Sequence, residues 1–232
     1  MNSNSLSSFL SQWSSKDLNV IDASIPKSDY IAIDISKANP DLNSFDVSSS
    51  LAWENYITNY LLQHNKQVAF GGYLEQRNLY NRSTYFSSQS KAEQRNIHLG
   101  LDLWCPANTA VSACFDGTIH SFKNNTNFGD YGPTIILEHK IENQIFYTLY
   151  GHLNIESLNS FTKGDKVAQG QTIAYLGDVS VNGDYAPHLH FQIIKDLQNN
   201  IGDYPGVCCL DDLEFYKVNT VNPEVVLGFD II

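Results

Sequence analysis

The stretch PHLHFQII, residues 187–194, alternates apolar and polar side chains with a period of two. Such alternation is typical of a β-strand with one face turned toward a hydrophobic core. The positions expected to face the core are Leu189, Phe191 and Ile193. His188, His190 and Gln192 then share the opposite face, which brings two imidazoles to one side of the predicted strand.

Two other segments show a similar pattern. In NIHLGLDLW, residues 96–104, the apolar positions are Ile97, Leu99, Leu101 and Leu103. The opposite face of this segment carries His98, Gly100 and Asp102. In FYTLYGHL, residues 146–153, one side carries Phe146, Thr148, Tyr150 and His152. Three segments therefore each present an imidazole or a carboxylate on one face of a predicted strand.

The rest of the chain favours a mainly β fold. From Val68 onward, short apolar or alternating runs are separated by Gly, Asn, Asp and Pro, which indicates an antiparallel β-sandwich or barrel-like domain. With 232 residues, 42% of them hydrophobic, the chain is long enough for one well-filled domain and a small extension. We predict a main β domain over residues 66–232 and a small α/β flank, docked on it, over residues 1–65.

The predicted flank contains one strand and one helix. DYIAIDIS, residues 29–36, has isoleucine at every second position and predicts a strand. SSSLAWENYITNYLLQHN, residues 48–65, predicts the only convincing helix, with Ser50 as its candidate N-cap. The apolar residues at helical spacing are Trp53, Ile57, Tyr60 and Leu61.

Charge and hydropathy narrow the classes of partner. The net charge is −11 and there is no basic run, which argues against nucleic acid as a partner. No apolar run approaches the roughly 20 residues that a membrane helix requires. The first twenty residues lack the basic and apolar regions of a signal peptide, so we expect a cytoplasmic protein. We expect the four cysteines to be reduced and mostly buried: Cys105, Cys114, Cys208 and Cys209.

Two imidazoles and a carboxylate suit a divalent metal ion, with zinc as the leading candidate. On a straight strand, His98 and Asp102 would lie about 13 Å apart, too far to share one ion. The segment must therefore bend, and Gly100 is where a bend costs least.

Three motifs in order resemble the lysostaphin-type zinc metallopeptidases, which cleave bacterial peptidoglycan. They are HLGLD at 98–102, YGHL at 150–153 and PHLHFQ at 187–192, and the resemblance covers roughly residues 97–194. It implies a β fold of the duplicated hybrid motif type. It also implies that His98, Asp102 and His190 bind zinc, while His152 and His188 handle protons beside the metal.

Three further stretches resemble a variant of this domain that is fused to aminotransferase-like and small-molecule-kinase-like modules. They are GGYLEQRNLY at 71–80, GDYGPTIILEH at 129–139 and GDYPGV at 202–207. The resemblance implies aminotransferase-like or kinase-like proteins as separate partners. Ala186 stands where the cell-wall enzymes carry glycine before the Pro-His pair.

These features predict a zinc-dependent metalloendopeptidase that hydrolyses a peptide or amide bond, with a peptidoglycan-type peptide as the leading substrate class. Tyr150 and Arg77 are candidate substrate contacts, although a solvated surface position is the more ordinary interpretation of Arg77. His120 and His139 are interpreted as structural. The residues do not decide which of His152 and His188 is the base.

The alternatives are a zinc hydrolase of the same fold acting on a soluble intracellular amide or small metabolite, or a non-catalytic binding module. The stretch KGDKVAQGQTI at 163–173 also resembles hairpins of lipoyl and biotin carriers. A cupin would place a glutamate shortly after the second histidine of H-x-H, where this chain has Ile194 and Lys195. A pseudoenzyme would have lost metal ligands, and all three are present.

Overall fold

The computed structural model describes residues 6–13, 18–82 and 93–229. The first twenty residues, for which a signal peptide was considered, lie partly outside the described ranges. Thirteen strands occur in the described part of the chain. Their bounds are β1 Tyr30–Ala32, β2 Val68–Gly71, β3 Ile97–His98, β4 Leu101–Trp104, β5 Ala110–Ser112, β6 Gly117–Asn125, β7 Gly132–Ile141, β8 Gln144–Gly151, β9 Lys166–Val167, β10 Thr172–Tyr175, β11 His188–Ile194, β12 Val207–Cys208 and β13 Thr220–Val221.

Four α-helices also occur in the described ranges, and they are α1 Leu6–Ser11, α2 Ser50–His64, α3 Leu213–Asn219 and α4 Pro223–Leu227. The prediction of a single convincing helix was therefore wrong. The three additional helices are short, at five to seven residues, so their sequences show little periodicity. The sequence of α4 does carry a capping signal, because Asn222 caps the helix, Pro223 begins it and Gly228 ends it in the left-handed region.

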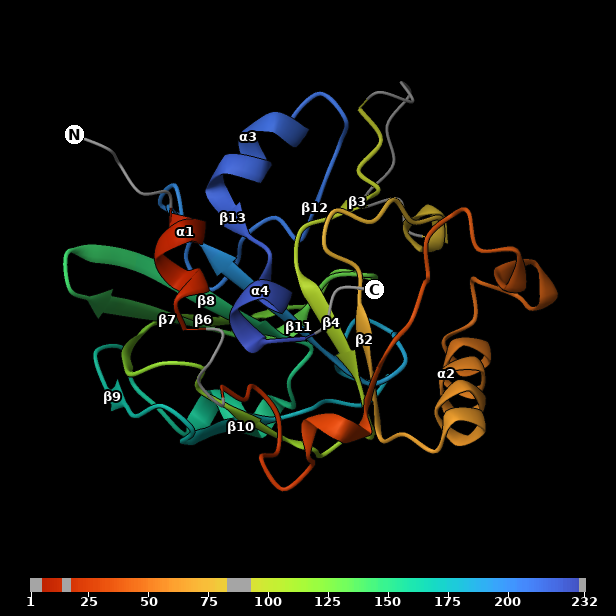
Figure 1. Ribbon diagram of the computed structural model, residues 1–232, viewed down its shortest axis with the longest axis horizontal. Coiled ribbons are helices and arrows are strands. Elements are labelled where there is room, and N and C mark those ends of the chain that lie inside the picture. The colour runs from red at the N-terminus through yellow and green to blue at the C-terminus, as the bar shows by residue number, and fades with distance from the viewer. Residues whose placement is uncertain (1–5, 14–17, 83–92, 230–232) are drawn as a thin grey trace.

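A mixed sheet dominates the fold, and the predicted mainly β class is confirmed (Figure 1). Across the described residues its strand order is β1-β2-β4-β11-β8-β7-β6-β9, with β13 also paired to β11. Only the pair β1–β2 is parallel in this sheet, and the other pairs are antiparallel. Two small sheets, β5–β10 and β3–β12, complete the strand pairing.

One face of the large sheet packs on the main hydrophobic core. Leu189, Phe191 and Ile193 of β11 are all fully buried in it, as the alternation predicted. The small sheet β5–β10 and helices α1 and α4 supply apolar side chains to the same cluster. Each fully buried side chain of this kind contributes about 1.5–3 kcal/mol, which makes this alternation a strong determinant of strand register.

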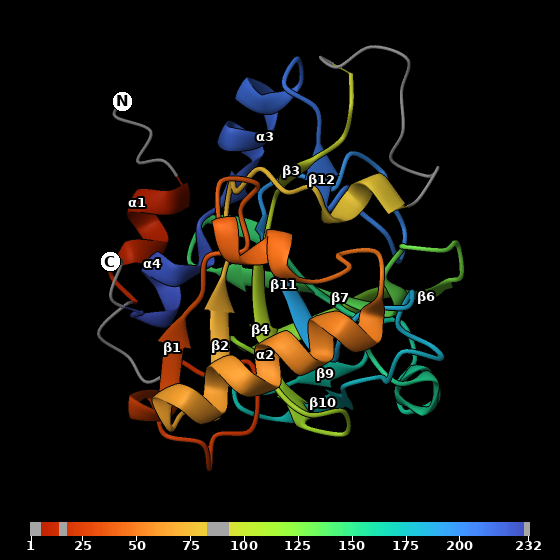
Figure 2. The same ribbon diagram turned by 90° about the vertical axis from the view of Figure 1, so that its right-hand side faces the viewer.

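Helix α2 covers the opposite face of the sheet near β1 and β2 (Figure 2). Its buried Trp53 and Ile57 pack against Ala69 of β2 and Trp104 of β4. The N-cap is Ser49, whose side chain accepts a hydrogen bond from the backbone of Ala52, so the predicted cap at Ser50 is one residue too late. The shift is small because three consecutive serines offer equivalent caps.

The predicted flank and main domain share one sheet, since β1 pairs with β2. Their division at residues 65 and 66 stays a prediction.

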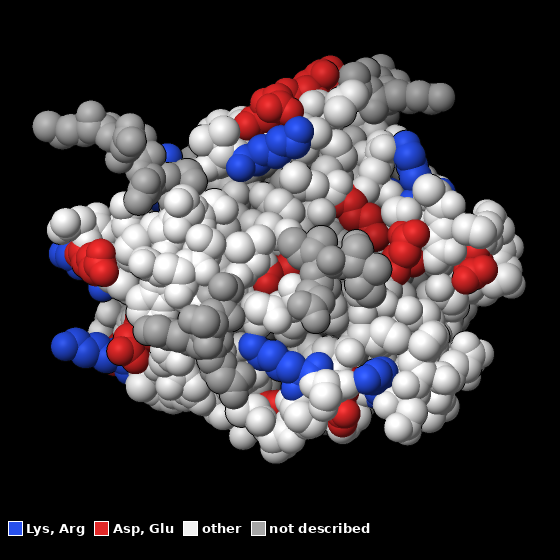
Figure 3. All heavy atoms as spheres, viewed as in Figure 1, with Lys and Arg blue, Asp and Glu red and all other residues white. Residues whose placement is uncertain are grey.

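No helix in the described ranges is both long and apolar enough to span a bilayer. On the face shown in Figure 3, acidic and basic side chains are interspersed and separated by uncharged surface. The four cysteines are free and buried, as expected.

Candidate metal centre and active site

Strand register brings Asp102 and His190 together. In the antiparallel pair β4–β11 these two residues lie directly opposite each other, so their side chains leave the same face of the sheet. That face is turned away from the main core, as the alternation of the two strands predicted. The pairing therefore places the carboxylate of Asp102 and the imidazole of His190 side by side above the sheet.

His98 reaches the same position because the chain bends. Strand β3 pairs with β12 in a separate small sheet, whereas β4 belongs to the large sheet, and Leu99 and Gly100 join them. The bend predicted at Gly100 is confirmed. A Cβ atom on Gly100 would lie 2.7 Å from Cε1 of His190, so glycine also gives the imidazole room.

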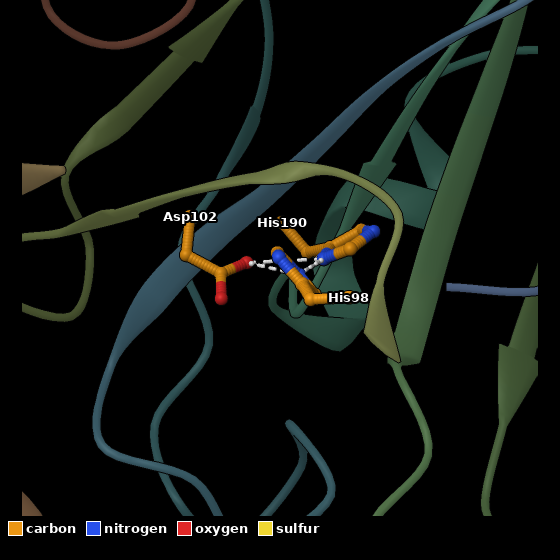
Figure 4. A group of neighbouring side chains, drawn as sticks. All are labelled: His98, Asp102 and His190. Atoms are coloured by element: carbon orange, nitrogen blue, oxygen red, sulfur yellow. Dashed lines mark hydrogen bonds and ion pairs between the residues drawn. The ribbon is translucent and has the colours of Figure 1, made fainter. Parts of the chain in front are cut away.

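Three donor atoms from these residues converge (Figure 4). Nε2 of His98 lies 3.2 Å from Oδ1 of Asp102, and Nδ1 of His190 lies 3.0 Å from that same oxygen. The two nitrogens are 2.9 Å apart. All three donor atoms lie within 4.8 Å of one another, and the residues are buried. Two imidazole nitrogens and one carboxylate oxygen form a donor set that fits a zinc-like divalent ion and leaves a coordination position open.

The surroundings of the imidazoles support this use of the donor atoms. Nδ1 of His98 lies 2.9 Å from the carbonyl oxygen of Gly72. Since a carbonyl only accepts hydrogen bonds, we assign the proton of His98 to Nδ1, which leaves a lone pair on Nε2. Nε2 of His190 faces the hydroxyl of Tyr131 at 3.4 Å, on the side of the ring away from the other donors. An outer partner for each ligating imidazole is the usual arrangement in metal sites.

The charge states also suit a cation. Burial, together with the charge of Arg77, lowers the pKa of His98 to about 3, so this imidazole is neutral at neutral pH. Burial by itself would raise the pKa of Asp102. Electrostatic interactions with the neighbouring His98 and with the charged Arg77 outweigh that effect and hold the pKa of Asp102 well below its usual value. At neutral pH the site therefore offers a neutral nitrogen and a carboxylate, which is what metal binding requires.

His152 and His188 stand beside the three donors. Their ring centroids are 4.2 Å apart, and Nε2 of His188 lies 3.8 Å from Oδ1 of Asp102. Nδ1 of His152 donates to the carbonyl oxygen of Asn182, and Nδ1 of His188 donates to that of Ala186. Both rings therefore present an unprotonated Nε2. Burial is the largest factor that lowers the pKa of each, so both are neutral bases.

Asn182 is a residue that the sequence interpretation missed. Its side chain is fully buried, donates to the carbonyl oxygens of Gly177 and Tyr185, and accepts from the amide of Tyr185. These bonds fix the loop whose carbonyl groups orient both histidines. An asparagine in a loop is part of no periodic pattern. The only signal in the sequence is that Asn182 lies shortly before the H-x-H motif.

Tyr150 does not share a face with His152. It is fully buried in the main core, packs on Phe191, and its hydroxyl accepts a hydrogen bond from the amide of Cys114. The alternation fails here because His152 has a φ of 63°, in the left-handed region, which turns its side chain to the other face. The structure thus places the predicted substrate contact Tyr150 away from the site.

Arg77 lies at the site and is not a solvated surface residue. Its side chain is 1% exposed, and its Nη1 lies 2.6 Å from Oδ2 of Asp102. Its Nε lies 2.6 Å from Oε2 of Glu75. The guanidinium thus pairs with two carboxylates. One of them belongs to Asp102, so in this structure Arg77 is an ion-pair partner of a candidate metal ligand. The sequence suggested otherwise because two charged residues in a polar loop are usually exposed.

A cavity of about 420 Å³ opens over the donors. Many of its lining side chains are aromatic, and these include Trp53, Tyr80, Trp104, Tyr131, Tyr185 and Tyr204. Trp53 comes from α2, so the predicted flank contributes to the wall. A cavity of this volume fits a short segment of peptide better than a metal ion alone.

The other two histidines considered earlier lie outside this cavity. His139 is fully buried and bonds to Thr148 and to the carbonyl oxygen of Asp116. His120 lies 2.9 Å from the hydroxyl of Ser121. Both histidines therefore bond to nearby protein groups, in agreement with the interpretation of His120 and His139 as structural residues.

Residues 96–201 match the model of a protein family described as Peptidase family M23. The matched segment includes the three donors and the two flanking histidines, so this part of the chain is similar to an M23 peptidase domain. A search of curated protein sequences found no significant match. The predicted aminotransferase-like and kinase-like partners, and the predicted cytoplasmic location, stay predictions.

Several solved structures resemble the chain in part. The catalytic domain of lysostaphin from Staphylococcus simulans is 26% identical, covers 53% of this chain and 80% of its own, and has a TM-score of 0.37. A zinc containing peptidase from Vibrio cholerae is 23% identical over 63% of this chain and 35% of its own, with a TM-score of 0.38. The catalytic domain of the prophage-encoded M23 protein EnpA from Enterococcus faecalis is 21% identical over 61% of this chain and 91% of its own, with a TM-score of 0.37.

Proposed function

We propose that the segment of this chain that matches the M23 family is a zinc-dependent endopeptidase, which hydrolyses a peptide or amide bond, with a peptidoglycan-type peptide as its substrate class. The observation that carries the proposal is the convergence of three donor atoms, from His98, Asp102 and His190, beside two neutral histidines. A structural metal site would close its coordination with a fourth protein ligand, whereas a catalytic one leaves a position open. Among the described residues only these three form such a cluster.

His98 Nε2, Asp102 Oδ1 and His190 Nδ1 would hold the metal. When bound, zinc polarises a carbonyl group and lowers the pKa of a coordinated water to about 7. The chain itself supplies the proton transfers. His152 and His188 line the cavity and each has an unprotonated Nε2, so one of them accepts the proton of the attacking water.

The second histidine then stabilises the tetrahedral species or donates a proton to the leaving amine. The carbonyl groups of Asn182 and Ala186 fix the orientation of both rings, whose centroids lie 4.2 Å apart. The aromatic cavity wall would exclude water from the peptide on either side of the scissile bond.

Hydrolysis assays test this proposal. The purified protein, loaded with zinc, would be incubated with muropeptides and, separately, with simple amides of small metabolites. We expect cleavage of muropeptides at an internal peptide bond, and loss of cleavage in His188→Ala. His120→Ala is the matched control, since it removes an imidazole outside the cavity and should leave the rate unchanged.

Cleavage of simple amides without cleavage of muropeptides would support the alternative of a soluble substrate. Absence of hydrolysis of either class by a protein with one bound zinc would contradict the proposed enzymatic function and favour a binding module.

A further inference from the structure

Arg77 is a buried charge that lies outside the segment matching the M23 family, at residues 96–201. It is 1% exposed, and its guanidinium contacts the carboxylates of Asp102 and Glu75 at 2.6 Å each. A buried charge is costly unless it is paired, and the two carboxylates offset the cost of burying this arginine.

The two oxygens of Asp102 have separate partners. Oδ1 faces the candidate metal position, 3.2 Å from Nε2 of His98 and 3.0 Å from Nδ1 of His190. Oδ2 points the other way and accepts a hydrogen bond from Nη1 of Arg77 at 2.6 Å. The charge-assisted hydrogen bond to the guanidinium holds Oδ2 toward Arg77, so that Oδ1 is the oxygen that faces the other donors. The carboxylate is therefore arranged to offer one oxygen.

Glu75 holds the arginine in place. Its Oε2 accepts from Nε of Arg77, while its Oε1 accepts from the backbone amide of Ile35 at 3.2 Å. Ile35 belongs to the N-terminal part of the chain, just beyond β1. A chain of contacts thus runs from the N-terminal segment through Glu75 and Arg77 to the candidate ligand Asp102.

Gly72 completes the arrangement. A Cβ atom at this position would lie 1.8 Å from Nη2 of Arg77, and its φ of 109° also favours glycine. The carbonyl oxygen of Gly72 accepts from Nδ1 of His98. Residues 72–77 therefore contact two of the three donor residues, although they precede the matched family segment.

We propose that Arg77, held by Glu75, is a positioning residue that fixes Asp102 as a one-oxygen ligand, so that residues 72–77 form part of the metal centre. This inference rests on the proposed zinc function. The guanidinium matches the planar carboxylate in a way that a lysine ammonium does not, because the fork can engage Asp102 and Glu75 simultaneously. Without it, Asp102 would be free to rotate and to offer both oxygens to the metal.

Four variants of the full chain separate this role from simple stabilisation. Arg77→Gln removes the charge, Arg77→Lys keeps the charge but loses the fork, and Glu75→Gln weakens the support of Arg77. The control is Thr148→Val, which removes a buried hydroxyl bonded to His139 on the core side of the sheet, away from the cavity. We expect this control variant to have a lower melting temperature but an unchanged zinc affinity and an unchanged cobalt spectrum.

Two measurements are made on each variant. Zinc affinity is measured by competition with a chromophoric chelator, and the coordination of Co²⁺ is read from its visible absorption spectrum. We expect zinc to bind about 10–100-fold more weakly in Arg77→Gln, as is usual when an outer partner of a metal ligand is lost. Smaller losses are expected in Arg77→Lys and Glu75→Gln. The cobalt bands should weaken in Arg77→Gln, since a second carboxylate oxygen raises the coordination number.

An unchanged zinc affinity and an unchanged cobalt spectrum in Arg77→Gln would overturn the inference. If Arg77→Gln does not fold, the same result in both Arg77→Lys and Glu75→Gln overturns it. Equal losses of zinc affinity in Thr148→Val and the Arg77 variants would overturn it as well, because general destabilisation would then explain the effect. These outcomes differ from failure of the proposed function, in which the wild-type protein itself binds no zinc or, with zinc bound, hydrolyses neither substrate class.

Discussion

Replacement of Gly100 by alanine is expected to displace His190 from the donor cluster. The new Cβ would lie 2.7 Å from Cε1 and 2.8 Å from Nε2 of His190, and 2.8 Å from the carbonyl oxygen of Phe191. Ordinary contact for a Cβ begins at 3.4 Å, so the shortest of these contacts is about 0.7 Å too close. The backbone of Gly100 lies outside the left-handed region, so the penalty is steric.

The imidazole must move more than the backbone. The carbonyl of Phe191 belongs to β11, which is paired on both sides with β4 and β8, and this pairing resists displacement. Metal-to-ligand distances tolerate about 0.2 Å, so a ring shift of several tenths of an ångström weakens binding. Overpacking of this kind costs about 1–3 kcal/mol, and each kcal/mol lowers the melting temperature by about 2–4 °C in a chain of this size.

Thermal unfolding of the metal-free protein would measure the loss of stability. Competition for zinc with a chelator would measure the loss of zinc affinity. Gly117→Ala is a matched control, because its Cβ would meet Nδ1 of His139 at 2.7 Å and the carbonyl oxygen of Glu138 at 2.8 Å, outside the cavity. We expect both variants to lose stability and only Gly100→Ala to lose zinc affinity, by tenfold or more. Wild-type zinc affinity in Gly100→Ala would refute the reasoning.

Three further predictions follow from the same geometry. Burial lowers the pKa of His139 from 6.5 to about 4, so below pH 6.5 the unfolded chain binds a proton that the folded chain does not. The metal-free protein should therefore lose about 3 kcal/mol of stability from this group as pH falls from 6.5 to 4, and urea unfolding of His139→Gln should lack that loss. His152→Ala should retain zinc yet lose at least 100-fold in kcat, measured on the cleaved muropeptide, because its Nε2 handles a proton without ligating. Removal of zinc by a chelator should lower the melting temperature, and zinc at 100 times its Kd should restore about 2.7 kcal/mol, as read by calorimetry; no thermal shift on zinc addition would count against a bound ion.

Much of the site was predictable because strand alternation and register are dictated by burial. The apolar residues of β4 and β11 fix which face each strand turns to the core, and this alone places Asp102 and His190 on the other face. The bend at Gly100 followed from a distance that a straight strand could not satisfy. These inferences needed only periodicity and the reach of the chain.

The errors arose where local geometry departs from a regular strand. The left-handed φ of His152 separates it from Tyr150, and alternation gives no warning of such a residue. Arg77 was interpreted as a surface residue because burial of a charge depends on partners far along the chain, here Asp102, 25 residues away. The short helices α1, α3 and α4 were missed because their stability comes from tertiary packing and capping, not from a long periodic pattern.

The most direct test of the account is the zinc content of the purified full chain, measured beside that of His190→Ala. His190 supplies one of the three converging donor atoms and lies opposite Asp102 in the register of β4 and β11. The account predicts one zinc ion per wild-type chain after loading and dialysis, and loss of that ion in the folded His190→Ala variant. Equal zinc content in the two proteins, or no zinc in the wild type, would contradict it.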